Sequence, residues 1–213
     1  MATAQRLTAL GWDPVVAPFL LIERRNPALP KPVQAVLITS GNALAGLAPS
    51  GLPLLAVGDS TAARARAAGF TDVRSAGRDA AALVDLAVTT LDPARGTVLL
   101  ASGLGQGKQV ADGLRARGFR VSRRVVYAAL PPRAFPAEAA AAMQSGTLHA
   151  ALFLSAETAH HFVRLLPSGL RPVLRSIFAL AIGKSTADTL HAVAWRQVRL
   201  ARSPTLDDVL ALL

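Results

Sequence analysis

The sequence predicts an α/β protein built from two copies of one unit, each with a parallel sheet. Residues 56–62 (AVGDSTA) return at residues 181–187 (AIGKSTA). An apolar run ending in a hydroxyl residue at 35–40 (AVLITS) returns at 150–155 (AALFLS). Such runs are typical of buried parallel strands that deliver a polar group to the carboxyl edge of the sheet. Two copies of this pattern predict a protein that works between them.

The start of the chain supplies a third pair of matching segments. Residues 7–12 (LTALGW), followed by a valine pair at 15 and 16, match residues 114–119 (LRARGF), followed by a valine pair at 125 and 126. We therefore expect the chain to open with a helix and a strand over residues 3–18. Because this match links the start of the chain to the end of its middle block, the copies do not lie simply end to end.

The order of the pieces predicts the domain organisation. The simplest assembly has one continuous domain, residues 22–127, and one discontinuous terminal domain, residues 1–18 plus 132–213. The chain would then cross between the domains at residues 18–22 and 127–132. Both crossings are marked by proline, so we expect them to pair as a two-stranded antiparallel hinge.

Composition favours a well-packed α/β protein. A chain of 213 residues with 52% hydrophobic content can bury one or two cores. The absence of cysteine excludes disulfides and a thiolate metal site. No apolar segment reaches the ~18 residues that a membrane span needs, and residues 1–10 lack the apolar stretch of a signal peptide. We expect a cytoplasmic protein without a membrane partner.

The net charge of +10, from 23 basic against 13 acidic residues, has two explanations. Arginine-rich and alanine-rich chains can reflect the nucleotide composition of the genome alone. The functional explanation is an anionic ligand, because a basic site concentrates anions. The basic residues are dispersed and aromatic residues make up only 5% of the chain, so no nucleic-acid surface is expected. A small polycarboxylate or phosphate fits better.

A glycine-rich loop at residues 103–108 (GLGQGK) follows an apolar strand and opens a helix, where anions bind backbone amides. It is no Walker A loop, because Gln109 stands where Ser or Thr is required after Lys108. The dinucleotide fingerprint places its third glycine one residue later. Arg123 and Arg124 also replace the acidic ribose ligand. An NADP-binding oxidoreductase stays a minor alternative, since arginine can meet a 2′-phosphate.

The histidines predict no metal site. His160 and His161 are adjacent on an expected helix and so point in different directions, and His149 and His191 are isolated. The chain has no Gly-x-Ser-x-Gly nucleophile elbow. We therefore expect neither a metal nor an organic cofactor.

The paired helix starts are the best candidates for a binding site. Ser60-Thr61 and Ser185-Thr186 each follow a strand and a glycine. Helix capping alone would explain one copy. Two copies facing each other would rim a cleft with backbone amides, and this suits a ligand with many carboxylates.

These residues resemble the uroporphyrinogen-III synthase family over nearly the whole chain. The segments that carry the resemblance keep the family's order and spacing: residues 36–44 (VLITSGNAL), 56–62, 118–127, 152–155 and 181–187. The resemblance implies two flavodoxin-like (Rossmann-like) domains joined by the two-stranded hinge, with the substrate in the cleft. It implies a lyase of haem biosynthesis that needs no cofactor and acts as a monomer. Transient contact with the preceding enzyme of the pathway is compatible with that activity.

The implied substrate is hydroxymethylbilane, a linear tetrapyrrole with eight carboxyl groups. It loses its terminal hydroxyl to give an azafulvene, and the ring closes through a spiro-pyrrolenine with inversion of the last pyrrole. Tyr127, the only tyrosine, resembles the residue that helps the hydroxyl leave. Thr186 resembles a threonine that contacts the carboxylates. The further substrate-binding residues expected on the two rims are Gly183, Ser185, Ser155, Ser40, Ser60, Thr61 and Lys108.

One departure from the family concerns the start of the chain. Family members begin with a strand that ends in Thr-Arg-Pro or a close variant, whereas this chain starts almost inside the first helix. The counterpart in the other domain is present at residues 98–101 (VLLA). That strand is central in the order 2-1-3-4-5, so we expect the terminal domain to have a gap flanked by unpaired backbone. A late start site, a truncated chain and a degraded domain all explain it. The last keeps a noncatalytic tetrapyrrole- or anion-binding module as an alternative function.

Overall fold

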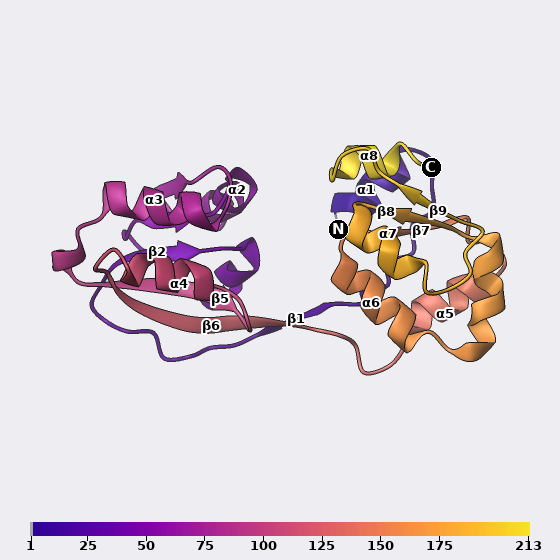
Figure 1. Cartoon of the computed structure of the whole chain (residues 1–213), viewed down its shortest axis with the longest axis horizontal. Coiled ribbons are helices and arrows are strands. Elements are labelled where there is room, and N and C mark those ends of the chain that lie inside the picture. Colours follow the sequence, from indigo (N-terminus) through magenta and orange to yellow (C-terminus); the bar gives the residue numbers. More distant parts are fainter. Residues whose placement is uncertain (1) are drawn as a thin grey trace. The chain divides into compact units, whose positions relative to one another are not determined.

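A computed structural model describes residues 2–213 and divides the chain into two compact units. Unit 1 combines Met1–Leu21 with Pro131–Leu213, and unit 2 is the continuous segment Ile22–Leu130 (Figure 1). Each unit contains a sheet of parallel strands with helices around it. The predicted α/β fold class is thus confirmed.

Unit 2 is built on a six-stranded sheet in the order β1-β6-β5-β2-β3-β4. The pairs β6/β5, β5/β2, β2/β3 and β3/β4 are all parallel. Continuous apolar sequences such as VQAVLI and TVLLASG form the central strands because both faces of the sheet are covered. The strands are β1 (Leu21–Arg24), β2 (Val33–Ile38), β3 (Leu54–Ala56), β4 (Val73–Ser75), β5 (Thr97–Gly103) and β6 (Arg120–Leu130).

The helices of unit 2 pack on both faces of the sheet and form one hydrophobic core on each face. Val36 and Ile38 of β2 pack with buried residues of η1 and α2. Leu37, between them, packs on the opposite face with buried residues of α3 and α4. The alternation follows from the two-residue period of a strand. The helices are η1 (Gly41–Gly46), α2 (Asp59–Ala67), α3 (Ala80–Thr90), η2 (Pro93–Arg95) and α4 (Lys108–Arg115).

Unit 1 has a three-stranded parallel sheet in the order β7-β8-β9. Its elements come from both ends of the chain, and Arg6 of α1 forms an ion pair with Asp207 of α8. The strands are β7 (Ala150–Phe153), β8 (Phe178–Ala181) and β9 (Gln197–Leu200). The helices are α1 (Ala2–Ala9), α5 (Ala137–Gln144), α6 (Ala156–Leu165), η3 (Ser168–Ser176), α7 (Lys184–Leu190) and α8 (Leu206–Leu210).

The two faces of the unit 1 sheet are packed unequally. One face carries a cluster in which Phe19, Phe135 and Phe162 make edge-to-face contacts, with ring centroids 5.1 to 5.4 Å apart. Trp195 stacks on Phe162 at 5.4 Å. The other face has a small core whose buried members are Phe178, Leu180, Ala201 and Val209. The side of the sheet that faces α8 is therefore the thinner one.

One predicted strand does not form. The valine pair at residues 15 and 16 was expected to continue the first helix into a strand, but residues 12–18 form no strand and have no ladder pairing. A strand needs a neighbour to accept its backbone hydrogen bonds. Within residues 2–213, nothing is paired to β7 on the side away from β8, so this segment has no partner.

The segments expected to form the hinge are extended in part. β1 begins at Leu21 and lies next to β6, which continues to Leu130, and the amide of Arg25 donates to the carbonyl of Val126 at 2.9 Å. Pairing of residues 18–22 with 127–132 as a hinge stays a prediction. None of the helices within residues 2–213 has the length and apolar character needed to cross a membrane.

Candidate functional site

The carboxyl edges of the two sheets have the same local geometry. In unit 2 the amide of Val57 donates to the carbonyl of Ile38 at 3.1 Å. In unit 1 the amide of Ile182 donates to the carbonyl of Phe153, also at 3.1 Å. Both bonds join the residue after one strand to the last residue of its neighbour. The repeat seen in the sequence is thus a repeat of hydrogen bonds at the edge where parallel strands place their functional groups.

The predicted helix starts follow these bonds. Gly58 precedes α2 with φ −157° and ψ 170°, and Gly183 precedes α7 with φ −160° and ψ 169°. Because the residue before each helix is a glycine, no side chain at that position accepts a hydrogen bond from the first-turn amides. Ser60 and Ser185 are exposed beside these amides.

The two threonines at these helix starts differ. Thr61 is half-buried, whereas Thr186 is buried at 2% exposure. The amide of Thr186 donates to the carbonyl of Gly183 at 3.1 Å. In this conformation Thr186 lies against the core of unit 1, so contact between its hydroxyl and a substrate carboxylate requires the helix start to open.

Ser40 and Ser155 already serve as helix caps. The Ser40 hydroxyl accepts from the amide of Asn42 at 3.2 Å. The Ser155 hydroxyl accepts from the amide of Thr158 at 3.1 Å and donates to the Thr158 hydroxyl at 2.8 Å. Both serines stand at the carboxyl edges that the sequence predicted. Their hydroxyls orient the helix starts, and a ligand would compete with these bonds.

Tyr127 lies inside unit 2, on β6. It is 2% exposed, and its hydroxyl donates to Oε1 of Gln106 at 2.7 Å. Its ring passes over Gly103, where an added Cβ would come within 2.7 Å of the Tyr127 Cζ atom. The amide of Leu104 donates to the Tyr127 carbonyl at 2.9 Å. The glycine at 103 therefore admits the ring, and the loop that follows holds its hydroxyl.

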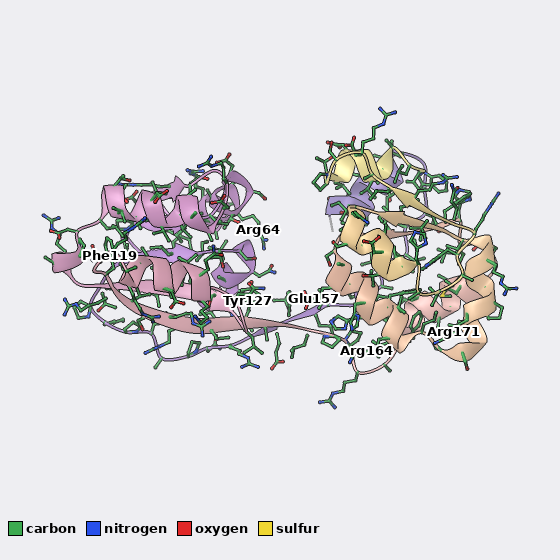
Figure 2. All side chains as sticks on the ribbon, viewed as in Figure 1. Arg64, Phe119, Tyr127, Glu157, Arg164 and Arg171 are labelled. Carbon is green, nitrogen blue, oxygen red and sulfur yellow. The ribbon has the colours of Figure 1, made fainter. Side chains whose placement is uncertain are left out.

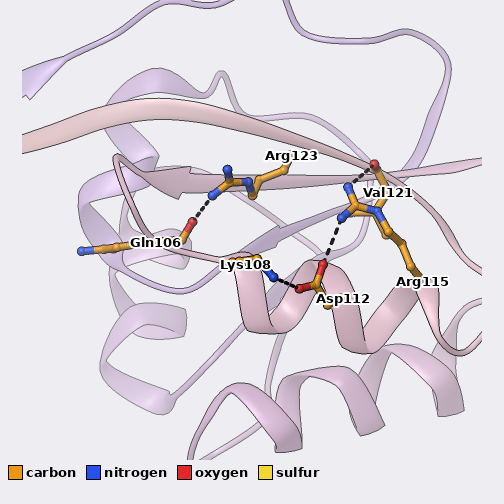
Figure 3. A network of polar contacts seen from close by, with 6 residues as sticks. All are labelled: Gln106, Lys108, Asp112, Arg115, Val121 and Arg123. Carbon is orange, nitrogen blue, oxygen red and sulfur yellow. Dashed lines mark hydrogen bonds and ion pairs between the residues drawn. The ribbon is translucent and has the colours of Figure 1, made fainter.

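Arg123 also contacts this loop, and two ion pairs lie on α4, the helix that follows it (Figure 3). Arg123 Nη1 donates to the Gln106 carbonyl at 2.6 Å. Lys108 Nζ donates to Asp112 at 2.6 Å, and Arg115 Nη1 reaches the same carboxylate at 3.3 Å. The hydrogen bond from Lys108 is the main cause that holds the pKa of Asp112 below its usual value. The Lys108 side chain is 83% exposed, so it remains accessible to an anion.

The predicted residues gather into one set in each unit. In unit 2 the parallel strands β2, β3 and β5 bring Ser40, Ser60, Thr61 and Lys108 to one edge of the sheet. Tyr127 pairs with Gly103 at this edge; Figure 2 places it toward the same end of unit 2 as Arg64, with Phe119 at the opposite end. In unit 1, β7 and β8 bring together Ser155, Gly183, Ser185 and Thr186.

Three polar residues at the unit 2 edge were not predicted from the sequence. Gln106 holds the Tyr127 hydroxyl. The hydroxyls of Thr39 and Ser102 are buried without a hydrogen-bond partner among residues 2–213. Their strands pair in register at Ile38 and Ala101, one residue earlier. Thr39 and Ser102 each follow an apolar run, as Ser40 does, so this sequence pattern could have identified both.

The glycine-rich loop does not suit a dinucleotide. A pyrophosphate needs bare backbone at the second glycine position and an open helix start. The space over Gly103, the first glycine of the loop, is filled by the Tyr127 ring and Gln106 Oε1, whereas Gly105, the second, is open. The oxidoreductase alternative therefore fails mainly at the third glycine position, where Lys108 stands.

Comparison with known proteins decides the family. The sequence model described as uroporphyrinogen-III synthase HemD matches residues 1–211. The chain belongs to the uroporphyrinogen-III synthase family. Members of this family are lyases of haem biosynthesis that act on a linear tetrapyrrole. The family and the main function predicted from the sequence are confirmed by this match.

One solved structure of a uroporphyrinogen-III synthase has a similar fold. The crystal structure of the Helicobacter pylori synthetase aligns with a TM-score of 0.63 at 19% identity, covering 91% of this chain and 89% of the other. A wild-type Thermus thermophilus structure aligns at 23% identity over 99% of this chain and 91% of the other, with a TM-score of 0.40. No curated protein sequence matches the chain significantly. The likeness to the Helicobacter structure supports the fold alone.

Proposed function

We propose that this chain cyclises hydroxymethylbilane to uroporphyrinogen III, with loss of water and inversion of the last pyrrole. The observation that carries the proposal is the family match over residues 1–211. The duplicated carboxyl edges support it, because a substrate with eight carboxyl groups needs several anion-binding positions. The net charge of the chain is +10, and a positive charge attracts the negative carboxylates of such a substrate. The reaction class would be a carbon–oxygen hydro-lyase, and we expect it to act as a cytoplasmic monomer.

The substrate carboxylates would be bound from both units. In unit 2 we assign them to the exposed Ser60, Thr61 and Lys108, with Ser40 beside them. In unit 1 the corresponding group is Gly183, Ser185, Thr186 and Ser155. Backbone amides at the two helix starts would bind carboxylates without any charged side chain. Holding the linear chain in one conformation would account for most of the rate, because ring closure depends on bringing its two ends together.

Tyr127 would assist the first chemical step. The bond between the terminal carbon and its hydroxyl oxygen breaks, and the oxygen leaves as water once it has gained a proton. The electron pair of the pyrrole nitrogen stabilises the cationic carbon as an azafulvene. The substituted carbon of the last pyrrole ring then attacks this electrophilic carbon, and the spiro intermediate rearranges and loses a proton. The Tyr127 hydroxyl now donates to Gln106, so helping the leaving oxygen requires it to exchange this partner.

Replacing Tyr127 by phenylalanine tests this role. Tyr127→Phe keeps the buried ring and removes only the donor, so we expect turnover to fall about tenfold or more while substrate binding persists. The assay supplies freshly generated hydroxymethylbilane and separates the inverted type III product from the spontaneous uninverted ring by chromatography. Phe119→Leu, at the other end of the unit 2 sheet, controls for small losses of packing. Unchanged turnover in Tyr127→Phe would remove the hydroxyl from the mechanism.

The open edge of unit 1 favours one second candidate, a noncatalytic module that binds tetrapyrroles or other anions. Both candidates predict binding of the linear substrate, and they differ in the product. Saturable binding to a folded chain that yields only the uninverted ring would support the module. Formation of the type III isomer above the spontaneous background would support the synthase.

A further inference from the structure

Unit 2 has a cavity between η1 and α2. It measures about 400 Å³ and lies within unit 2. Cavities that bind small molecules combine an apolar lining with a few polar groups, and this cavity has both. The apolar lining residues are Ile22, Leu44, Ala45, Ala67 and Ala68, and the polar ones are Asn42 and Arg64. We call this cavity the Arg64 pocket.

The Arg64 side chain crosses from α2 to the first residue of η1. A Cβ atom added to Gly41 would come within 2.6 Å of Cζ and Nη1 of Arg64, and within 2.7 Å of Nε. The guanidinium group therefore lies against the bare Cα of Gly41, which is buried. Glycine at residue 41 leaves the space that the guanidinium group occupies.

The guanidinium group of Arg64 has no acceptor of its own. Within residues 2–213 it forms neither an ion pair nor a side-chain hydrogen bond. Arg66, two residues later, donates instead to the Val73 carbonyl at 2.8 Å. A guanidinium group presents a fork of donors that fits the two oxygens of a carboxylate. The exposed Arg64 side chain is thus held in place with its donors available to an anion.

The Arg64 pocket adjoins the carboxyl edge of the unit 2 sheet. η1 follows β2 and α2 follows β3, and these two strands are parallel neighbours. Ser60 and Arg64 are four residues apart on α2, so they share one face of that helix. Figure 2 shows Arg64 toward the same end of unit 2 as Tyr127. A long ligand that reaches the Ser60 hydroxyl can therefore place a further anionic group against Arg64.

Unit 1 lacks both halves of the contact between glycine and arginine. In the sequence repeat, Ala156 stands at the position of Gly41, and Thr189 stands at the position of Arg64. The Thr189 hydroxyl donates to the Ser185 carbonyl at 2.9 Å, within its own helix. Of the two copies, only unit 2 has the arginine, and only unit 2 has the glycine that admits it.

We propose that Arg64, held against Gly41, is a substrate-binding residue whose pocket takes one side-chain carboxylate of the linear tetrapyrrole. The carboxylate accepts two hydrogen bonds from the guanidinium group and a further one from the Asn42 amide, and the attached pyrrole ring contacts the apolar lining. Because unit 1 has no such arginine, the pocket distinguishes the part of the substrate bound to unit 2. The identity of the ligand rests on the proposed function, whereas the presence of a carboxylate site does not.

Kinetics of the full chain with freshly generated hydroxymethylbilane tests the role of Arg64. Arg64→Gln removes the charge, and we expect KM to rise about fivefold or more while kcat changes little. Arg64→Lys keeps the charge but loses the fork of donors, so KM should rise about threefold or more. Arg120→Gln removes an exposed arginine at the start of β6 and should leave KM unchanged. Equal rises in Arg64→Gln and Arg120→Gln would overturn the proposal, because net charge alone would explain them.

Gly41→Ala moves the guanidinium group without changing any charge. The backbone accepts alanine, because residue 41 does not have a positive φ. We expect KM to rise about threefold or more, since the added Cβ displaces the guanidinium group. Combined with Arg64→Gln, the change should have almost no further effect, because both substitutions remove the same contact. Full additivity would overturn the proposal that Gly41 holds Arg64 for the substrate.

A small probe tests the site without the reaction. Pyrrole-3-acetate at millimolar concentration should shift the NMR signals of the Arg64 Nε–H group and the Asn42 side-chain amide, and pyrrole itself should shift neither. Arg64→Gln should abolish the Asn42 shift. If these shifts appear but the wild type forms no type III isomer, the carboxylate site stands and the synthase assignment fails. Shifts that are absent, or that persist in Arg64→Gln, would overturn the site even if the type III isomer forms.

Discussion

The two units carry the same β-strand and helix-start motif, but within residues 2–213 only β2 of unit 2 has a parallel strand, β5, on the side away from its matched neighbour, whereas β7 of unit 1 has none. In unit 2 the face that packs on α3 and α4 has twelve buried apolar residues, and the corresponding face of unit 1 has four, counted over residues 2–213. β5 supplies Val98 and Leu100 to that face of unit 2. A central strand therefore contributes a pairing edge and also the surface on which two helices pack.

The opposite faces of the two sheets differ much less. In unit 1 the aromatic cluster around Phe162 packs under α5, α6 and η3, and η3 and α5 have no counterpart in the unit 2 sequence repeat. On the other face, Val110 and Leu114 of α4 are buried, whereas the described side chains of α1 are half-buried or exposed. Added helices can thus complete one face of the unit 1 sheet, while the face next to α8 has fewer buried residues among residues 2–213.

The largest expected effect is on amide exchange of two matched leucines. Leu37 directs its amide to β5. Leu152, at the matching position of β7, directs its amide away from β8, to a side where no strand is paired within residues 2–213. We expect the Leu152 amide to exchange about 100-fold faster or more, because it lacks the ladder bond. Hydrogen exchange followed by NMR at single-residue resolution measures the ratio. Comparable rates would mean that the β7 edge is covered in solution.

A smaller difference is expected between two matched aromatic residues. Phe119→Ala leaves a cavity in the buried core of unit 2 and should cost about 3–5 kcal/mol of unfolding free energy. Trp12→Ala removes a side chain that is partly exposed and should cost about 1 kcal/mol. Urea unfolding followed by far-UV circular dichroism measures both, and the emission of Trp195 follows unit 1 in the second variant. Equal costs would show that Trp12 is as deeply buried as Phe119 in solution.

The smallest expected effect concerns two exposed ion pairs. Lys108 with Asp112 and Lys184 with Asp188 are both i,i+4 pairs at helix starts, at 2.6 and 3.2 Å. Lys108→Met and Lys184→Met should each change the unfolding free energy by less than about 0.5 kcal/mol, because both lysines are exposed.

Substrate binding should separate the two lysine variants. If Lys108 binds a carboxylate of hydroxymethylbilane, its variant should raise KM at least threefold with little change in kcat. The Lys184 variant should leave KM within twofold of the wild type. An unchanged KM for Lys108→Met would remove this lysine from the site.

Much of the fold could be predicted because the chain repeats itself. Two copies of an apolar run before a hydroxyl residue determined β2 and β7, and two glycines before Ser-Thr located the starts of α2 and α7. The valine pair at residues 15 and 16 gave the wrong prediction of a strand. Its sequence matches β6, but a strand also depends on a neighbour that no local pattern reports.

The site was predicted only in part for a similar reason. Ser40, Ser155 and the helix starts could be predicted because each comes after the end of a strand, and the end of an apolar run shows where a strand ends. The burial of Tyr127 and its bond to Gln106 depend on the ring passing over Gly103, and two segments more than twenty residues apart create that contact. Thr186 is predicted as a substrate-binding residue from its position after a glycine, and its burial at 2% exposure could not be predicted from that position.

The ion pair between Arg6 and Asp207 joins residues 201 positions apart, and this separation sets an order of events during synthesis. Unit 2 can fold on the ribosome as soon as residue 130 has emerged, since all its strands are then available. Helix α1 is made before unit 2, yet its ion pair with α8 can form only after the rest of unit 1 has been made. Phe19 also has to wait, because the other members of its core cluster all follow residue 130 in the chain.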